Sequence, residues 1–151
     1  MIKHINIITF NRAFLLEDCI ESIINVLGDS RKDYQINVFD DGSTTNETKE
    51  FLEEAKAKGS VDYYEIGNRA GVAQNSNRAL RYSKRQNADI IFLLNDDIVL
   101  QKNAFAIYEN ALEKTDFHHF CFTDKQSPNK PFQEFILKKM QNGLQKIHCK
   151  S

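Results

Sequence analysis

One stretch of the sequence, residues 89–100, limits most strongly what this chain can fold into. Five apolar residues, Ile90–Leu94, lead directly into the polar triplet Asn95, Asp96 and Asp97. A short apolar run rich in branched side chains and bounded by polar residues is typical of a strand buried on both faces of a parallel sheet. Because adjacent carboxylates repel each other, the pair favours a counter-cation, and a divalent metal with oxygen ligands fits best. A solvated turn with two surface acids is the alternative.

Strand and helix patterns alternate along the rest of the chain. Apolar runs predict strands over residues 5–9, 35–39, 61–66 and 90–94. Helical spacing predicts helices over residues 15–27, from a cap at Ser43 or Thr44 to near Gly59, and over 71–82 and 104–112. This order predicts an α/β fold with a mostly parallel, Rossmann-like sheet flanked by helices. Beyond it we expect a strand over 117–122, a loop around Pro128 and Pro131, and an amphipathic helix over 132–147.

Composition limits the classes of protein and partner. With 151 residues, 41% of them apolar, the chain is long enough for one domain with a real core. A net charge of −1 predicts no general affinity for nucleic acid or anionic membranes. The three cysteines are far apart and predict free thiols, with Cys19 packed in a helix. Because no apolar run approaches the ~20 residues of a transmembrane segment and the start lacks signal-peptide features, we expect a cytoplasmic protein.

Polar side chains follow three of the predicted strands. They are Thr9 to Arg12 after the first, Asp40 to Ser43 after the second, and Asn95 to Asp97 after the fourth. The carboxyl ends of parallel strands meet at one edge of the sheet, where open α/β sheets bind their ligands, so these loops should converge in one crevice. There a carboxylate can accept a base N–H, another can bind a metal, and Arg12 can face a phosphate.

Several common motifs are absent from the sequence. It contains no Gly-x-Gly-x-x-Gly after the first strand, no Gly-Lys-Ser/Thr loop and no Gly-x-Ser-x-Gly turn. Dinucleotide oxidoreductases, P-loop nucleotidases and hydrolases with a nucleophile elbow therefore lose their main support.

Four segments together resemble the family 2 glycosyltransferases of GT-A fold. They are Ile5–Arg12, Val38–Thr44, Asn68–Ala79 and Ile91–Asp97, and both their order and their spacing match over roughly residues 3 to 110. The resemblance implies a nucleotide-diphospho-sugar donor and a divalent metal, Mg²⁺ or Mn²⁺. It also implies an acceptor, which can be a saccharide, a lipid or a protein.

The resemblance also implies roles for individual residues. Asp97 matches the last acid of the Asp-x-Asp motif, the direct metal ligand, and Asp96 its variable middle position. Asn95 replaces the first acid, and can still bind a ribose hydroxyl without supplying charge. Thr9 would lie beside the nucleoside, and Asp41 would accept a hydrogen bond from the base. The remaining candidates for nucleotide-sugar binding are Asn11, Arg12 and Gly71.

We expect one GT-A-like domain over residues 1–151, with a nucleotide-sugar-binding half at 1–100 and a short remainder of the acceptor side at 101–151. Family members usually continue further past the metal motif and supply a carboxylate base there. Apart from Glu109 and Glu113, which belong to the helical pattern, the acids that follow in this chain are Asp116, Asp124 and Glu134, and none has motif context. The hypotheses are therefore a metal-dependent, inverting glycosyltransferase, a nucleotide-sugar-binding module that needs further chain or a partner chain, and a generic doubly wound domain with another ligand.

Overall fold

The computed structural model describes residues 1–114, 134–136 and 148–150. The chain divides into two compact units, Met1–Lys102 and Asn103–Ser151, and each is described by itself. The assignment of all 151 residues to one GT-A-like domain stays a prediction.

The first unit alternates strands and helices as the sequence predicts. Its elements are β1 (Lys3–Thr9), α1 (Ala13–Leu27), the 3₁₀ helix η1 (Gly28–Asp33), β2 (Tyr34–Asp40), α2 (Asn46–Ala57), β3 (Tyr63–Ile66), α3 (Val72–Arg85) and β4 (Ile90–Asn95). The strands form one parallel sheet in the order β3-β2-β1-β4. The prediction of an α/β fold with a parallel sheet is confirmed. Because β1 lies between β2 and β4, the loop after β1 is flanked by the loop after β2 on one side and by the loop after β4 on the other.

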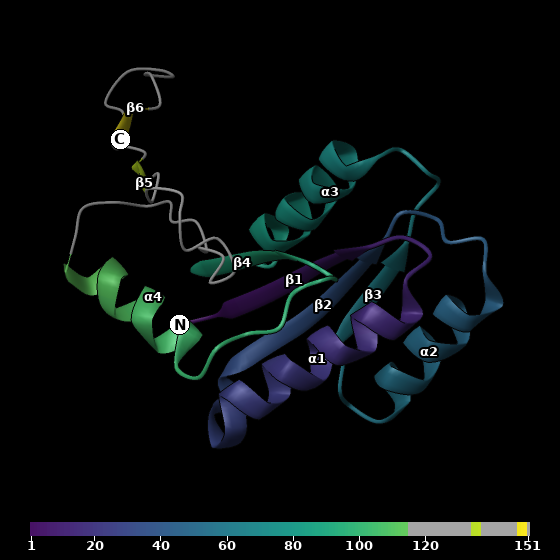
Figure 1. Cartoon of the computed structure of the whole chain (residues 1–151), viewed down its shortest axis with the longest axis horizontal. Coiled ribbons are helices and arrows are strands. Elements are labelled where there is room, and N and C mark those ends of the chain that lie inside the picture. Colours follow the sequence, from purple (N-terminus) through teal and green to yellow (C-terminus); the bar gives the residue numbers. More distant parts are fainter. Residues whose placement is uncertain (115–133, 137–147, 151) are drawn as a thin grey trace. The chain divides into compact units, whose positions relative to one another are not determined.

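Helices cover both faces of this sheet, α3 on one and α1 with α2 on the other (Figure 1). Successive side chains of a strand point to opposite faces. In β1, Ile5 and Ile7 therefore face the α1 and α2 layer, while Ile8 packs with Phe39 and Ala79 beneath α3. These branched residues are buried, and their removal from water stabilises the sheet.

A polar network lies buried between the sheet and α3. Asn6 Nδ2 donates to Ser83 Oγ at 2.7 Å and to the Ala79 carbonyl at 3.2 Å, and Asn37 Nδ2 donates to Asn6 Oδ1 at 2.9 Å. His4 Nδ1 lies 2.9 Å from Ser83 Oγ. Since unpaired buried polar groups cost free energy, these hydrogen bonds offset much of the cost of a polar layer in the core.

We expect the stability of the fold to fall as the pH is lowered, because of the histidine in this network. Burial lowers the pKa of His4 below its usual 6.5, and outweighs the opposing charge of Asp62 and a hydrogen bond with Gln35. Below pH 6.5 the unfolded chain therefore binds a proton that the folded chain resists, so His4 contributes stability that is lost as pH falls from 6.5 toward the folded pKa. Urea unfolding at pH 7.5 and 5.5 should show a larger loss for wild type than for His4→Gln. Equal losses would contradict this role.

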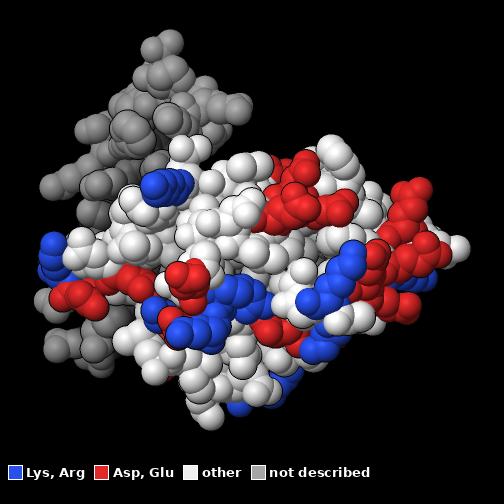
Figure 2. All heavy atoms as spheres, turned by 90° about the horizontal axis from the view of Figure 1, so that it is seen from below, with Lys and Arg blue, Asp and Glu red and all other residues white. Residues whose placement is uncertain are grey.

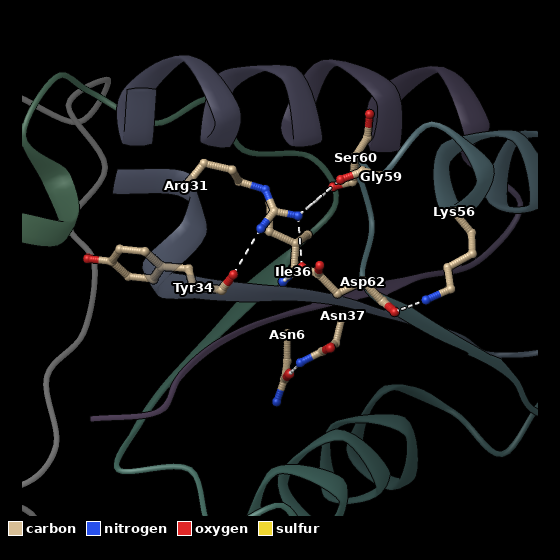
Figure 3. Close-up of polar contacts among 9 residues, drawn as sticks. All are labelled: Asn6, Arg31, Tyr34, Ile36, Asn37, Lys56, Gly59, Ser60 and Asp62. Carbon is tan, nitrogen blue, oxygen red and sulfur yellow. Dashed lines mark hydrogen bonds and ion pairs between the residues drawn. The ribbon is translucent and has the colours of Figure 1, made fainter. Parts of the chain in front are cut away.

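A second polar group fixes the sheet at the end where β2 begins (Figure 3). Arg31 of η1 donates to the Tyr34 carbonyl at 2.9 Å and pairs with Asp62 at 2.8 Å. Asp62 in turn accepts the Ile36 N–H at 2.7 Å. The group joins η1, β2 and the connection before β3, and it lies opposite the edge that carries the candidate site.

Charged side chains on the face presented in Figure 2 are interspersed rather than gathered in one basic field. This mixture agrees with nearly equal counts of Lys plus Arg, 20, and Asp plus Glu, 21. Within the described residues, no helix has the length and apolar character that crossing a bilayer requires.

The second unit begins with α4 (Ala104–Lys114), which confirms the helix predicted over 104–112. It also contains β5 (Glu134–Ile136) and β6 (His148–Lys150), which pair antiparallel. The helix predicted over 132–147 is therefore wrong at residues 134–136, since Phe135 and Ile136 are adjacent apolar residues and these fit a short strand as well as a helix. The rest of that helix, the strand at 117–122 and the loop at Pro128 and Pro131 lie outside the described residues.

Candidate functional site

Four of the predicted site residues meet where β1 and β4 end. Thr9 Oγ1, at the end of β1, donates to Asp96 Oδ2 at 2.6 Å. Arg12 Nη1 lies 3.2 Å from Asp96 Oδ1 and 3.2 Å from Asp97 Oδ2, so a single nitrogen bridges both carboxylates. The sequence places them together because β1 and β4 are neighbours and pair in parallel from Lys3 to Ile8.

The two carboxylates occupy different environments. Only 4% of the Asp96 side chain is exposed, against 48% for Asp97. Burial raises the pKa of the Asp96 carboxyl, although the Thr9 hydrogen bond and the Arg12 charge act in the opposite direction. Both oxygens of Asp96 already accept hydrogen bonds, so Asp96 holds its neighbours in place, while Asp97 faces solvent and can exchange partners.

Asn11 joins the loop after β1 to the loop after β2. Its backbone N–H donates to Ser43 Oγ at 2.6 Å, and its side-chain oxygen accepts the Thr44 N–H at 2.7 Å. The predicted cap at Ser43 or Thr44 is therefore wrong, because these residues serve Asn11 and Asp40, and α2 begins after Thr45. The φ of Asn11 is +54°, a conformation that asparagine tolerates better than most residues.

Asp41 lies against the connection between β3 and α3. Its Oδ1 accepts the Ala70 N–H at 2.9 Å and its Oδ2 accepts the Gly71 N–H at 2.8 Å. Its own N–H donates to the Thr9 carbonyl at 2.9 Å, which places it beside the first cluster. Gly71 has φ +87° at the start of α3, which suits glycine.

Side chains from α3 hold the end of β2. Asn75 Nδ2 donates to the Phe39 carbonyl at 2.7 Å, and Arg78 Nη2 donates to the Asp40 carbonyl at 2.6 Å. Arg78 lies so close to Gly67 that a Cβ there would approach its guanidinium to 2.0 Å. These polar residues of α3 fix the end of β2 and the segment after β3 beside the site. Sequence periodicity alone does not indicate this role.

The model of the family described as Glycosyl transferase family 2 matches residues 5–146. The chain belongs to this family. Two crystal structures of TarS from S. aureus are similar to it. One, of residues 1–349, has a TM-score of 0.61 and 16% identity and covers 76% of this chain and 33% of that chain. The other has a TM-score of 0.57 and 14% identity and covers 76% and 20%.

At these identities the likeness to TarS shows the fold alone, and the chain spans a third or less of the length of the two TarS chains. A comparison with curated proteins found no significant match. The family and its GT-A fold are thus as the four sequence segments predict. The roles of the individual site residues stay predictions.

Within this family 2 chain, hydrogen bonds link the predicted site residues Thr9, Arg12, Asp41, Gly71, Asp96 and Asp97. Asn11 is bonded instead to Ser43 and Thr44. Asn95 is the exposed last residue of β4, and its carbonyl lies 3.7 Å from Cys19 Sγ. Burial raises the pKa of Cys19 to about 12, in agreement with its predicted packing role. Sequence reasoning did not single out Phe10 and Arg69, whose guanidinium lies 5.1 Å from the centre of the Phe10 ring. The signal was present, since both stand in the segments that resemble the family.

Gly42→Ala should destabilise this family 2 fold more than a glycine replacement elsewhere. Gly42 has φ +81°, and a Cβ there would lie 2.8 Å from the Gly67 carbonyl oxygen and 3.0 Å from the Arg69 nitrogen. We expect a loss of about 1–3 kcal/mol from backbone strain, with a further loss from these contacts. Gly59→Ala is the matched control, because φ is +77° there and no atom lies within 4 Å. Urea unfolding that gave equal losses would contradict the close approach.

Proposed function

We propose that this chain transfers a sugar from a nucleotide-diphospho-sugar to an acceptor hydroxyl with inversion, with the help of a divalent metal. The observation that carries the proposal is the junction of Thr9, Arg12, Asp96 and Asp97 beside the Asp41 loop, at one edge of a family 2 sheet. The carboxyl edge of a parallel sheet is where open α/β folds bind ligands. The acceptor class, whether saccharide, lipid or protein, is left open.

The donor set fits Mg²⁺ or Mn²⁺ held jointly with substrate. The described residues contain no group of three or more His, Cys, Asp or Glu side chains arranged around a cation. Mg²⁺ is commonly bound through one or two carboxylates, with substrate phosphates and water completing its shell. Asp97 would be that ligand, because it is the solvent-facing carboxylate. When bound, the metal neutralises the charge that develops on the leaving diphosphate.

The nucleoside half of the donor would lie between the loops after β1 and β2. Each oxygen of Asp41 accepts one amide N–H in the free protein. A carboxylate oxygen has two lone pairs, so Asp41 can still accept from a base N–H. Thr9 and Asn11 fix the positions of Asp96 and of the Ser43 loop. Gly71, whose N–H donates to Asp41, would lie close to the base, and Asn95 would face the ribose.

Inverting transfer also requires a base that deprotonates the acceptor hydroxyl as it attacks. The sequence does not identify this base, because Asp116, Asp124 and Glu134 are acids without motif context. Asp116 and Asp124 lie outside the described residues, and Glu134 begins β5. A binding module that holds the donor and depends on further chain or a partner for transfer is therefore the second candidate function.

A panel of nucleotide sugars distinguishes these functions. The purified chain is mixed with each donor, with and without Mn²⁺, and followed by thermal shift and by release of nucleoside diphosphate. If a donor stabilises the chain when Mn²⁺ is present and not when it is absent, the result supports a metal site shared between the protein and the donor. Release of the diphosphate, accelerated by an added acceptor, identifies a transferase, whereas stabilisation without release identifies a binding module. No Mn²⁺-dependent stabilisation by any donor would contradict the proposal.

A further inference from the structure

The Arg12 side chain stands where a metal ion would act on Asp97. Its Nη1 is shared between Asp96 and Asp97 at 3.2 Å each, and half of the Arg12 side chain is exposed. The two contacts are unequal, because Asp96 is buried and held by Thr9 whereas Asp97 is half exposed. Arg12 is therefore anchored on Asp96, and its contact with Asp97 is the one that solvent and other cations can reach.

From this arrangement we propose that Arg12 is an internal counter-cation that competes with the divalent metal for Asp97 and turns to the donor diphosphate when the metal binds. This inference rests on the proposed function, because it assigns the metal to Asp97. It makes Arg12 a positioning residue in the free protein and a ligand-binding residue in the loaded one.

Electrostatics supports the exchange in both directions. An exposed ion pair contributes little to stability, so the Arg12–Asp97 contact can be broken easily. A dication on Asp97 would repel the guanidinium, and the repulsion moves Arg12 away from Asp97 without removing it from buried Asp96. A guanidinium has five N–H donors, and those not used by Asp96 can bind phosphate oxygens.

The competition predicts opposite effects on two affinities. Without Arg12, two uncompensated carboxylates attract Mn²⁺ alone more strongly. The complex of Mn²⁺ with a nucleoside diphosphate binds more weakly to the variant, because the guanidinium that would contact the phosphates is missing. A residue that only stabilises the loop structurally would not change the two affinities in opposite directions.

Arg12→Gln is the test, with electron paramagnetic resonance of free Mn²⁺ as the readout. We expect Mn²⁺ alone to bind about tenfold more tightly than to wild type. Arg12→Lys should stay closer to wild type, since it keeps the charge. Arg81→Gln, which removes an equal charge from an exposed position of α3, controls for the change in net charge. Thermal unfolding confirms that each variant is folded.

Two further measurements locate the effect. The double variant Arg12→Gln/Asp97→Asn should lose the gained Mn²⁺ affinity. With Mn²⁺ saturating, calorimetry with UDP, GDP and ADP should show weaker binding to Arg12→Gln than to wild type for whichever diphosphate binds. Mn²⁺ affinity of Arg12→Gln no greater than that of Arg81→Gln overturns the competition, and unchanged diphosphate affinity overturns the second role. Failure of all three diphosphates to bind wild type would count against the proposed function and that second role, while the Mn²⁺ comparison still decides the first.

Discussion

Asp97→Ala should abolish Mn²⁺-dependent binding of the nucleoside diphosphate while leaving the fold of the first unit intact. The residue follows β4 and is half exposed, so its removal opens no cavity in the core. The described residues offer no alternative cluster of acids around a cation, and buried Asp96 is already bound by Thr9 and Arg12. We expect a loss of affinity of roughly a hundredfold or more, as for the removal of a cation worth several kcal/mol.

Calorimetry of the diphosphate with and without Mn²⁺ measures this loss, and circular dichroism with urea unfolding checks the fold. Asp29→Ala is a suitable control, because Asp29 is an exposed acid of η1. That variant should bind the diphosphate as wild type does. Unchanged Mn²⁺-dependent binding by Asp97→Ala would show that another group carries the metal.

Asp41→Ala should weaken the binding of nucleotide and free nucleoside to the same extent. A lost hydrogen bond to a charged group costs about 1.5–3 kcal/mol, and a contact to the base does not depend on the phosphates. Calorimetry with both ligands measures the two losses. Equal nucleoside affinity in the variant and wild type would rule out a base contact.

Asp41 also holds the amides of Ala70 and Gly71, so loss of affinity could arise from the loop instead. Asp41→Asn separates the two causes. The asparagine oxygen can still accept a hydrogen bond from the Ala70 or Gly71 N–H, but its NH₂ group is a donor and cannot accept one from a base N–H. Hydrogen exchange at Ala70 and Gly71 reports the loop directly. Weak nucleoside binding with wild-type exchange would identify the base contact as the cause.

The parts of this molecule that the sequence predicts well share one property, namely a pattern formed by residues close together in the sequence. The buried runs of β1, β2 and β4 and the alternation of strands and helices fix the parallel sheet, and the sheet brings Thr9, Asp41 and Asp97 to one edge. Asn6, Asn37 and Ser83 could not be assigned in this way, because polar residues inside a core depend on partners distant in sequence. The helix cap at Ser43 failed for the same reason, since Asn11 lies over 30 residues away.

Helix α3, which packs on the face of the sheet that carries the buried polar network, cannot slide along the sheet as a helix with purely apolar contacts can. An apolar contact surface is nearly indifferent to a small axial shift, because hydrophobic burial has no direction. Hydrogen bonds have direction, and α3 is tied to the sheet near both of its ends, by Asn75 to the Phe39 carbonyl and by Ser83 to Asn6. A shift of the helix by one turn would break both ties at once. These hydrogen bonds within the protein therefore fix the position of Gly71, at the start of α3, relative to the ends of β1 and β2, and no ligand is needed to do so.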